Sequence, residues 1–153
     1  MYSRQQASEL RQAFWTTFGQ YMAPVPSAEG ERINWINYRT GEKGIRFHME
    51  AESRKASVGI ELTLPDPGVR LLYFEQLLRW QDRLEAETGE KWTWLPEDLT
   101  ADGKEISRVF TELPNRSVFR KEDWPVLISF FKARMQALDR FWSEAKYSFE
   151  DLR

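Results

Sequence analysis

The feature that most constrains the fold of this chain is the order in which two hydrophobic periods occur along it. Apolar residues first recur at helical spacing, then alternate with polar residues, and later return to helical spacing on both sides of a strand pair. Helical spacing is typical of an amphipathic helix, whereas strict alternation is typical of a strand with one buried face. The pattern therefore predicts an α+β fold with the order α-β-β-β-α-β-β-α.

The first helix is expected from about Arg4 to Met22. Ser3 and Gln6 have the spacing of a capping box, which satisfies free backbone N–H groups at a helix start. Pro24 and Pro26 end the helix, because neither ring fits a continuing helical backbone. The apolar stripe consists of Leu10, Phe14, Phe18 and Tyr21 or Met22.

Three strands are expected to follow as an antiparallel meander. Residues 33–38 are rich in strand formers, and residues 45–50 and 56–64 alternate between apolar and polar side chains. Short polar connections favour antiparallel pairing, with one face apolar and the other polar. The polar face is expected to consist of Arg46, His48, Glu50, Ser57, Gly59, Glu61 and Thr63.

A second helix, a strand pair and a closing helix complete the predicted order. The second helix ends at Gly89, the strand pair occupies residues 92–95 and 106–113, and the closing helix begins near Pro125. The predicted stripes are Leu71, Phe74, Leu77, Leu78 and Leu84 for the second helix, and Trp124, Leu127, Ile128, Phe131, Met135, Leu138, Trp142 and Ala145 for the closing helix. We therefore expect one domain, residues 1–153, with a largely antiparallel sheet packed by helices on one face.

Composition narrows the classes of function. The 153 residues include no cysteine, which excludes disulfides, thiolate zinc sites and a cysteine nucleophile. The net charge is −2, with 22 basic against 24 acidic residues, so no global field favours nucleic acid. Arg116, Arg120 and Lys121 form a small basic group that is expected to be a solvated loop. No stretch resembles a signal peptide or a membrane span, so we expect a soluble, cytoplasmic protein without a membrane partner.

Two carboxylates are the strongest sign of chemistry in the chain. Glu50 and Glu61 are assigned to adjacent strands on the polar face, and if opposed they would hold Mg²⁺ through oxygen ligands. The element order also resembles the core of restriction-endonuclease-like nucleases, which carry Glu-x-Lys on the third strand. Here that strand contains Glu61-Leu62-Thr63, without the lysine. The alternative function is therefore a divergent or degenerate metal-dependent nuclease that uses Glu50, Glu61 and Mg²⁺.

The leading interpretation is a binding domain with no catalytic residues and no cofactor. Aromatic rings and arginines are common anchors of protein interfaces. They also bind nucleic acid, but Glu50 and Glu61 would repel phosphate, so a protein partner is favoured and nucleic acid is the alternative. A homo-oligomer that uses spare aromatic residues is a third interpretation. The predicted binding residues are Trp35, Arg46, His48, Glu50 and Glu61.

Several segments, in order along nearly the whole chain, resemble the bacterial domain-of-unknown-function family 4268. They are residues 11–15, 24–30, 33–35, 55–57, 59–62, 74–75, 123–125 and 130–131. Members of that family occur alone or C-terminal to restriction-type nuclease domains. The resemblance implies an accessory or recognition domain of a nuclease, DNA-metabolism or defence system, and it carries over no catalytic residue.

Overall fold

The computed structural model describes residues 2–153 and confirms an α+β fold. The helices are α1 (Arg4–Met22), α2 (Pro67–Leu78), α3 (Gln81–Thr88) and α4 (Trp124–Ala145), with short 3-10 helices η1 (Lys121–Asp123) and η2 (Lys146–Leu152) flanking α4. The strands are β1 (Ile45–Ala51), β2 (Lys55–Leu62), β3 (Thr93–Leu99) and β4 (Glu105–Pro114). Within residues 2–153, no helix is long and apolar enough to cross a membrane.

The four strands form one antiparallel sheet in the order β1-β2-β4-β3. In the register of β1 and β2, Phe47 lies opposite Ile60, and Arg46 lies opposite Glu61. Because successive side chains of a strand point to opposite faces, this register gathers the apolar residues on one face and the polar residues on the other. The alternation predicted for these two strands is confirmed.

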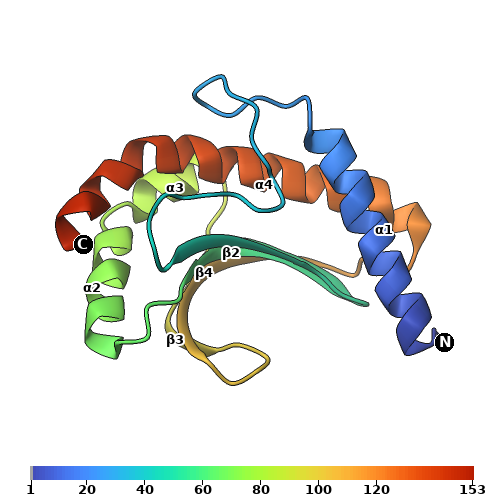
Figure 1. The fold of residues 1–153 in the computed structure, drawn as a ribbon, viewed down its shortest axis with the longest axis horizontal. Helices are drawn as coiled ribbons and strands as arrows, with labels where there is room; N and C mark the ends of the chain where they lie inside the picture. The colour runs from blue at the N-terminus through green and yellow to red at the C-terminus, as the bar shows by residue number, and fades with distance from the viewer. Residues whose placement is uncertain (1) are drawn as a thin grey trace.

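Helices cover only the apolar face of the sheet. α4 runs across this face, α1 packs near the N-terminal end of α4, and α2 and α3 lie towards its C-terminal end (Figure 1). Ile60 on β2, Phe131 on α4 and Phe14 on α1 are fully buried between these layers. Among the described elements no helix covers the opposite face, so the predicted packing of helices on one face is confirmed.

The strand predicted at residues 33–38 is wrong. Those residues lie in the irregular connection between α1 and β1. The side-chain oxygen of Asn34 accepts the backbone N–H groups of Ile36 and Asn37 at 3.1 and 3.0 Å. A side chain that binds backbone donors two and three residues later favours a turn, and it occupies N–H groups that a strand ladder would need.

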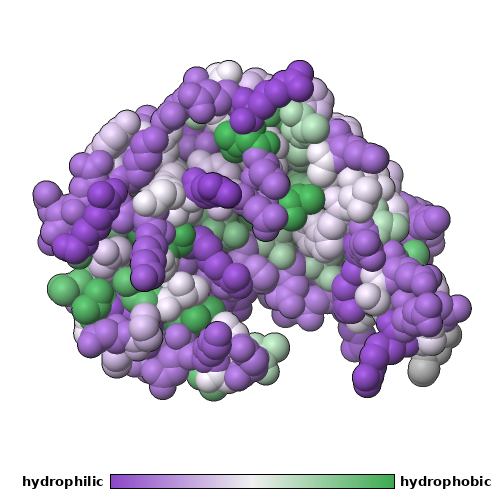
Figure 2. All heavy atoms as spheres, viewed as in Figure 1, coloured by the Kyte–Doolittle hydropathy of each residue, from purple (hydrophilic) through white to green (hydrophobic). Residues whose placement is uncertain are grey.

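The second predicted helix is two helices, α2 and α3, with a break at Trp80. The backbone N–H of Trp80 donates to Leu77 in a tight turn, and the Trp80 indole N–H donates to Ser148 at 3.0 Å. The buried stripe of α2 also differs from the prediction, because the helix buries Tyr73, Phe74 and Leu77. Leu71 and Leu78 are exposed, and apolar side chains gather on the surface over α2 (Figure 2). The helix end predicted at Gly89 is confirmed by its left-handed φ of 71°.

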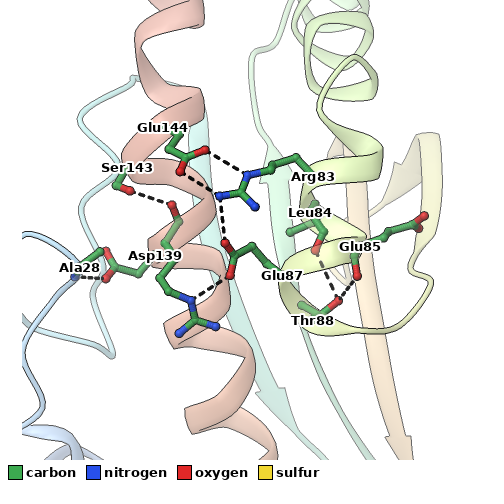
Figure 3. A network of polar contacts seen from close by, with 10 residues as sticks. Ala28, Arg83, Leu84, Glu85, Glu87, Thr88, Asp139, Ser143 and Glu144 are labelled. Atoms are coloured by element: carbon green, nitrogen blue, oxygen red, sulfur yellow. Dashed lines mark hydrogen bonds and ion pairs between the residues drawn. The ribbon is translucent and has the colours of Figure 1, made fainter.

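A buried carboxylate of α4 fixes the long connection between α1 and β1. Asp139 accepts the N–H of Ala28 at 2.6 Å and the hydroxyl of Tyr38 at 2.5 Å. Burial and this hydrogen bond raise the pKa of Tyr38 far above its ordinary value, so the hydroxyl remains a donor. Figure 3 shows the Asp139–Ala28 bond beside ion pairs, such as Arg83–Glu144 at 2.9 Å, that join α3 to α4.

Candidate binding face of the sheet

The sheet face away from α4 is the candidate functional site, and we call it the open face. It is built by alternate residues of all four strands, because the antiparallel register brings their same-side positions together. Its charged and aromatic members are Arg46, His48 and Glu50 on β1, Lys55 and Glu61 on β2, Arg108, Phe110 and Glu112 on β4, and Asp98 on β3.

A broad groove of about 1070 Å³ lies along part of the open face. The β3–β4 hairpin forms one wall, with Leu99, Asp102 and Lys104 near its tip, and Arg46 and Glu61 lie on the floor. Figure 2 shows the molecule hollowed between this hairpin and the N-terminal end of α1. The groove is slightly larger than the range typical of ligand pockets, roughly 300–1,000 Å³, and it is open to solvent.

β3 extends further than residues 92–95 because it contains an irregularity. The pairing of β3 with β4 shifts register between Leu95 and Asp98, around Pro96. Proline has no N–H to donate to a ladder and is tolerated on edge strands and at bulges. The shift lets β3 continue to Leu99 and brings Asp98 within reach of Arg108.

Glu61 is the buried centre of the open face. Its side chain is only 7% exposed and lies between two arginines, with Arg46 at 2.7 Å and Arg108 at 3.9 Å. A buried carboxylate is strongly destabilising unless it is paired and hydrogen-bonded. The two neighbouring strands therefore each supply a guanidinium to the same carboxylate.

Further charges continue the row in both directions from Glu61. On one side, Arg108 binds Asp98 at 3.0 Å and its guanidinium stacks over the ring of Phe110 at 4.1 Å. On the other side, Arg46 lies 3.4 Å from the ring nitrogen of His48, and His48 lies 3.8 Å from the carboxylate of Glu50. The result is a row of alternating charge across all four strands of the sheet.

Burial divides the row into a fixed centre at Glu61 and an accessible side on β1. The side chains of Arg46 and Glu50 are 53% and 52% exposed, against 7% for Glu61. Contacts among the charges hold the exposed side chains in defined positions. Such pre-organisation reduces the conformational entropy that binding must overcome.

Four of the five predicted binding residues lie together on the open face, and Trp35 does not. Trp35 is 2% exposed, belongs to the core and donates its indole N–H to Val25 at 3.0 Å. Its neighbour Tyr38 stacks on Phe47, which is on the helix-covered side of β1. The prediction of Trp35 as a binding residue depended on a strand at residues 33–38, and the structure has no strand there.

Sequence reasoning did not identify Arg108, Phe110 and Asp98 as site residues. The alternation of residues 106–113 does indicate Arg108 and Phe110, because they flank the buried Val109 and their side chains therefore point to the other face of the strand. Only the pairing of β2 with β4 places Arg108 opposite Glu61. Asp98 carries no such signal, because the register shift in β3 interrupts the alternation.

The two carboxylates proposed as metal ligands are not opposed across the sheet. Glu50 lies opposite Ser57, whereas Glu61 lies opposite Arg46. The offset of four residues separates their positions by about 13 Å along the strands, and an oxygen of Glu61 is occupied by Arg46. No group of three or more histidine, aspartate or glutamate residues suited to a metal ion occurs in the part of the chain described by the structure. This arrangement does not fit a metal centre built on Glu50 and Glu61.

The geometry defines a class: an α+β domain in which helices cover one face of an antiparallel sheet and the other face is open and charged. The chain belongs to the family described as domain of unknown function DUF4268, whose family model matches residues 10–146. No curated protein and no solved structure matches the chain.

Proposed function

We propose that this chain is a non-catalytic binding domain that holds a protein partner on the open face and along the outer edge of β1. The observation that carries the proposal is that β1 is the end strand of the sheet: among the described residues, no strand pairs with its outer edge and no helix covers its polar face. The two surfaces meet at Arg46 and His48, which line both the groove of the open face and a second recess beside the edge.

The outer edge of β1 offers unpaired backbone groups. The N–H of Thr63 donates to Gly44 O, and the N–H of Glu52 donates to Lys55 O. In this register the backbone N–H and C=O groups of the even-numbered residues of β1 point towards β2. The backbone groups of Phe47 and Met49 therefore point away from the sheet, and they form no hydrogen bond with any residue in the range 2–153. Unpaired edges of this kind are templates for an added strand.

The recess beside this edge is suited to the side chains of an extended segment. It has a volume of about 470 Å³ and its apolar walls include Trp15, Ile36 and Met49, with Arg39 and Arg46 adding charge. In strand addition, backbone hydrogen bonds supply affinity and pockets for alternate side chains supply specificity. The edge, the recess and the open face together form a continuous surface for one partner.

The charge of the open face favours protein over nucleic acid. Glu50, Asp98 and Glu112 lie among its arginines, and such carboxylates repel a phosphate backbone. A protein surface with charges of both signs complements an alternating row, and arginine and aromatic side chains are enriched among interface anchors. This argument supports a protein partner.

We place that partner in a bacterial nuclease, DNA-metabolism or defence system, within the cytoplasm. The support is the resemblance described above, because domains of that kind occur next to restriction-type nucleases. Under this proposal the chain contributes recognition, and another protein contributes any cleavage activity.

Capture of the partner from extract of the source cells tests the proposal. Tagged wild-type protein is compared with Arg46→Glu and with Arg79→Glu, an exposed arginine after α2 that serves as the matched control. Each extract is assayed with and without nuclease, and circular dichroism checks the fold of each variant. We expect one protein that survives nuclease treatment and is retained by the control, with capture reduced roughly tenfold by Arg46→Glu.

Two outcomes would contradict the proposal. The first is equal capture by folded Arg46→Glu and by the control. The second is capture that disappears on nuclease treatment, which would mean that nucleic acid carries the interaction. Cleavage of DNA or RNA by the purified protein with Mg²⁺, abolished by Glu61→Ala, would favour the nuclease alternative instead.

A further inference from the structure

Three segments that are distant in sequence converge at the end of the molecule near the N-terminus of α1, a region that we call the basic end. The N–H of Asn115 donates to Arg54 O at 2.8 Å, which fixes the segment after β4 to the β1–β2 turn. The N–H of Val118 donates to Glu52 O at 3.1 Å in the same place. The hydroxyl of Tyr2 donates to Phe119 O at 3.1 Å and attaches the N-terminal segment.

The convergence places three arginines around one recess. Arg54, Arg116 and Arg120 line a cavity of about 660 Å³ together with Ser53, Tyr2 and Phe119. Two of these arginines lie in the loop predicted to be merely solvated, and Arg54 joins them from a turn about sixty residues earlier. The chain as a whole has a net charge of −2, so the basic end is a local concentration of positive charge on a slightly acidic protein.

The arginines of the basic end are weakly neutralised. Within residues 2–153 the side chain of Arg54 forms no ion pair or hydrogen bond. Arg116 lies 3.9 Å from Asp123, whose other oxygen accepts the N–H of Ser117. Among residues 2–153, the one ion pair of Arg120 is with the exposed Glu122, at 3.4 Å. Each guanidinium has five N–H donors, so most of the donors here are available to an anion.

Aromatic rings lie beside these cations. Tyr2 is 51% exposed and its ring is tilted against Phe119 at a centroid distance of 5.6 Å. The guanidinium of Arg11 lies 4.9 Å from the centroid of Phe119 and adds a further positive charge to the group. The hydrogen bond of the Tyr2 hydroxyl fixes a ring that remains half open to solvent.

We propose that the basic end binds single-stranded nucleic acid. The arginines hold phosphates, and the exposed ring of Tyr2 stacks on a base. The cavity is larger than one phosphate requires, and only an unpaired strand offers the face of a base to a side chain. This site lies apart from the open face and goes beyond the proposed protein partner, whose binding depends on Arg46.

Fluorescence anisotropy with a labelled oligothymidylate and purified full-length protein tests the inference. The charge variant Arg54→Glu/Arg120→Glu changes two exposed side chains. The matched control, Arg79→Glu/Lys91→Glu, has the same net charge and also changes two exposed side chains, outside the basic end. We expect the charge variant to weaken binding by roughly tenfold or more and the control to change it less than about twofold.

Salt dependence adds a second measurement. Single-strand binding that neutralises Z phosphates has a slope of about −0.7Z in a plot of log K against log salt concentration. Loss of two contacts should therefore reduce the magnitude of the slope by about 1.4 in the charge variant. Equal slopes for the charge variant and the control would overturn the assignment to Arg54 and Arg120.

Substitution of Tyr2 distinguishes a nucleic acid site from general attraction of polyanions. Tyr2→Ala should weaken oligothymidylate binding about tenfold, whereas Tyr2→Phe retains the ring and should retain most of the affinity. A duplex of the same length should bind more weakly than the single strand. The proposal would be overturned if Tyr2→Ala had no effect and the duplex bound as tightly as the single strand. It would also be overturned if Tyr2→Ala had no effect and heparin, added as a competitor, bound as tightly as the oligothymidylate. These results do not depend on the partner capture described above.

Discussion

At the scale of residues, the open face depends on a glycine as much as on its charges. Gly59 lies between His48 on β1 and Phe110 on β4 in the sheet register. A Cβ built there would lie 2.1 Å from Val109 O and 2.7 Å from the Cα of Phe110. Both are backbone atoms of the neighbouring strand, so no side-chain rotation relieves the clash. Gly59 therefore permits the close approach of β2 and β4 that brings Arg108 towards Glu61.

We predict that Gly59→Ala lowers the free energy of unfolding by roughly 1–3 kcal/mol or more, as for other overpacked cores. The matched control is Gly19→Ala on α1, where the nearest atom is a flexible methyl of Ile36 at 3.0 Å and alanine favours the helix. Urea unfolding of both variants measures the difference. If Gly59→Ala were as stable as Gly19→Ala, β2 and β4 would be able to move slightly apart without loss of stability, which would contradict the prediction.

A second carboxylate acts at this scale by joining α3 to β3. Glu85 accepts the backbone N–H of Trp92 at 2.9 Å and the indole N–H of Trp94 at 3.3 Å. The backbone hydrogen bond, followed by the indole bond, lowers the pKa of Glu85 below its ordinary value. The anionic form is therefore stabilised by the folded state.

The lowered pKa of Glu85 predicts a contribution to stability that depends on pH. Since the folded pKa lies below the unfolded one, this contribution is complete above the unfolded pKa and is lost as pH falls through the folded pKa. Glu85→Gln should thus lower the melting temperature at pH 7. The difference in melting temperature between the variant and the wild type should become smaller at acidic pH. A difference that stays constant between pH 7 and pH 3 would contradict this account.

At the scale of elements, β1 is an edge strand with two kinds of backbone amide. Amides of the even-numbered residues, such as Arg46 and His48, bond to β2, whereas those of Phe47 and Met49 point outward. Hydrogen exchange depends on such bonds, because an amide without a partner exchanges without any opening of the sheet.

We predict that the amides of Phe47 and Met49 exchange much faster than those of Arg46 and His48 in the free protein. Addition of the captured partner should slow the first pair selectively, because an added strand supplies their missing acceptors. Exchange measured by NMR resolves each amide and includes the inward-pointing pair as an internal control. Unchanged exchange at Phe47 and Met49 in the complex would exclude strand addition and leave the open face as the sole contact surface.

At the scale of the whole molecule, the helix layer forms the core with one face of the sheet, and the open face does not take part in that core. α4 and α1 bury the aromatic core, and Asp139 fixes the long connection above it, so the polar side of the sheet is not needed for core formation. The basic end lies at one end of the molecule, while the exposed leucines of α2 lie at the other (Figure 2). The domain thus presents separate surfaces of different chemistry on one scaffold.

Sequence alone determined those elements whose signals are local. The capping box at Ser3 and Gln6 is present, and α1 spans the predicted Arg4–Met22. The alternation in β1 and β2 placed Arg46, His48, Glu50 and Glu61 on one polar face. Such signals are readable because a helix or strand repeats its geometry every few residues, so burial of one side leaves a periodic trace.

Only the tertiary structure decided which groups meet. Hydrogen bonds of Asn34 turned a segment of strand-forming residues into a loop, and this removed Trp35 from the predicted site. Pairing of β2 with β4 brought Arg108 to Glu61, and the same register separated Glu50 from Glu61. Backbone bonds between loops assembled the basic end from distant arginines. The physical reason is that strand register and loop docking depend on contacts between residues far apart in the chain, which leave no period in the sequence.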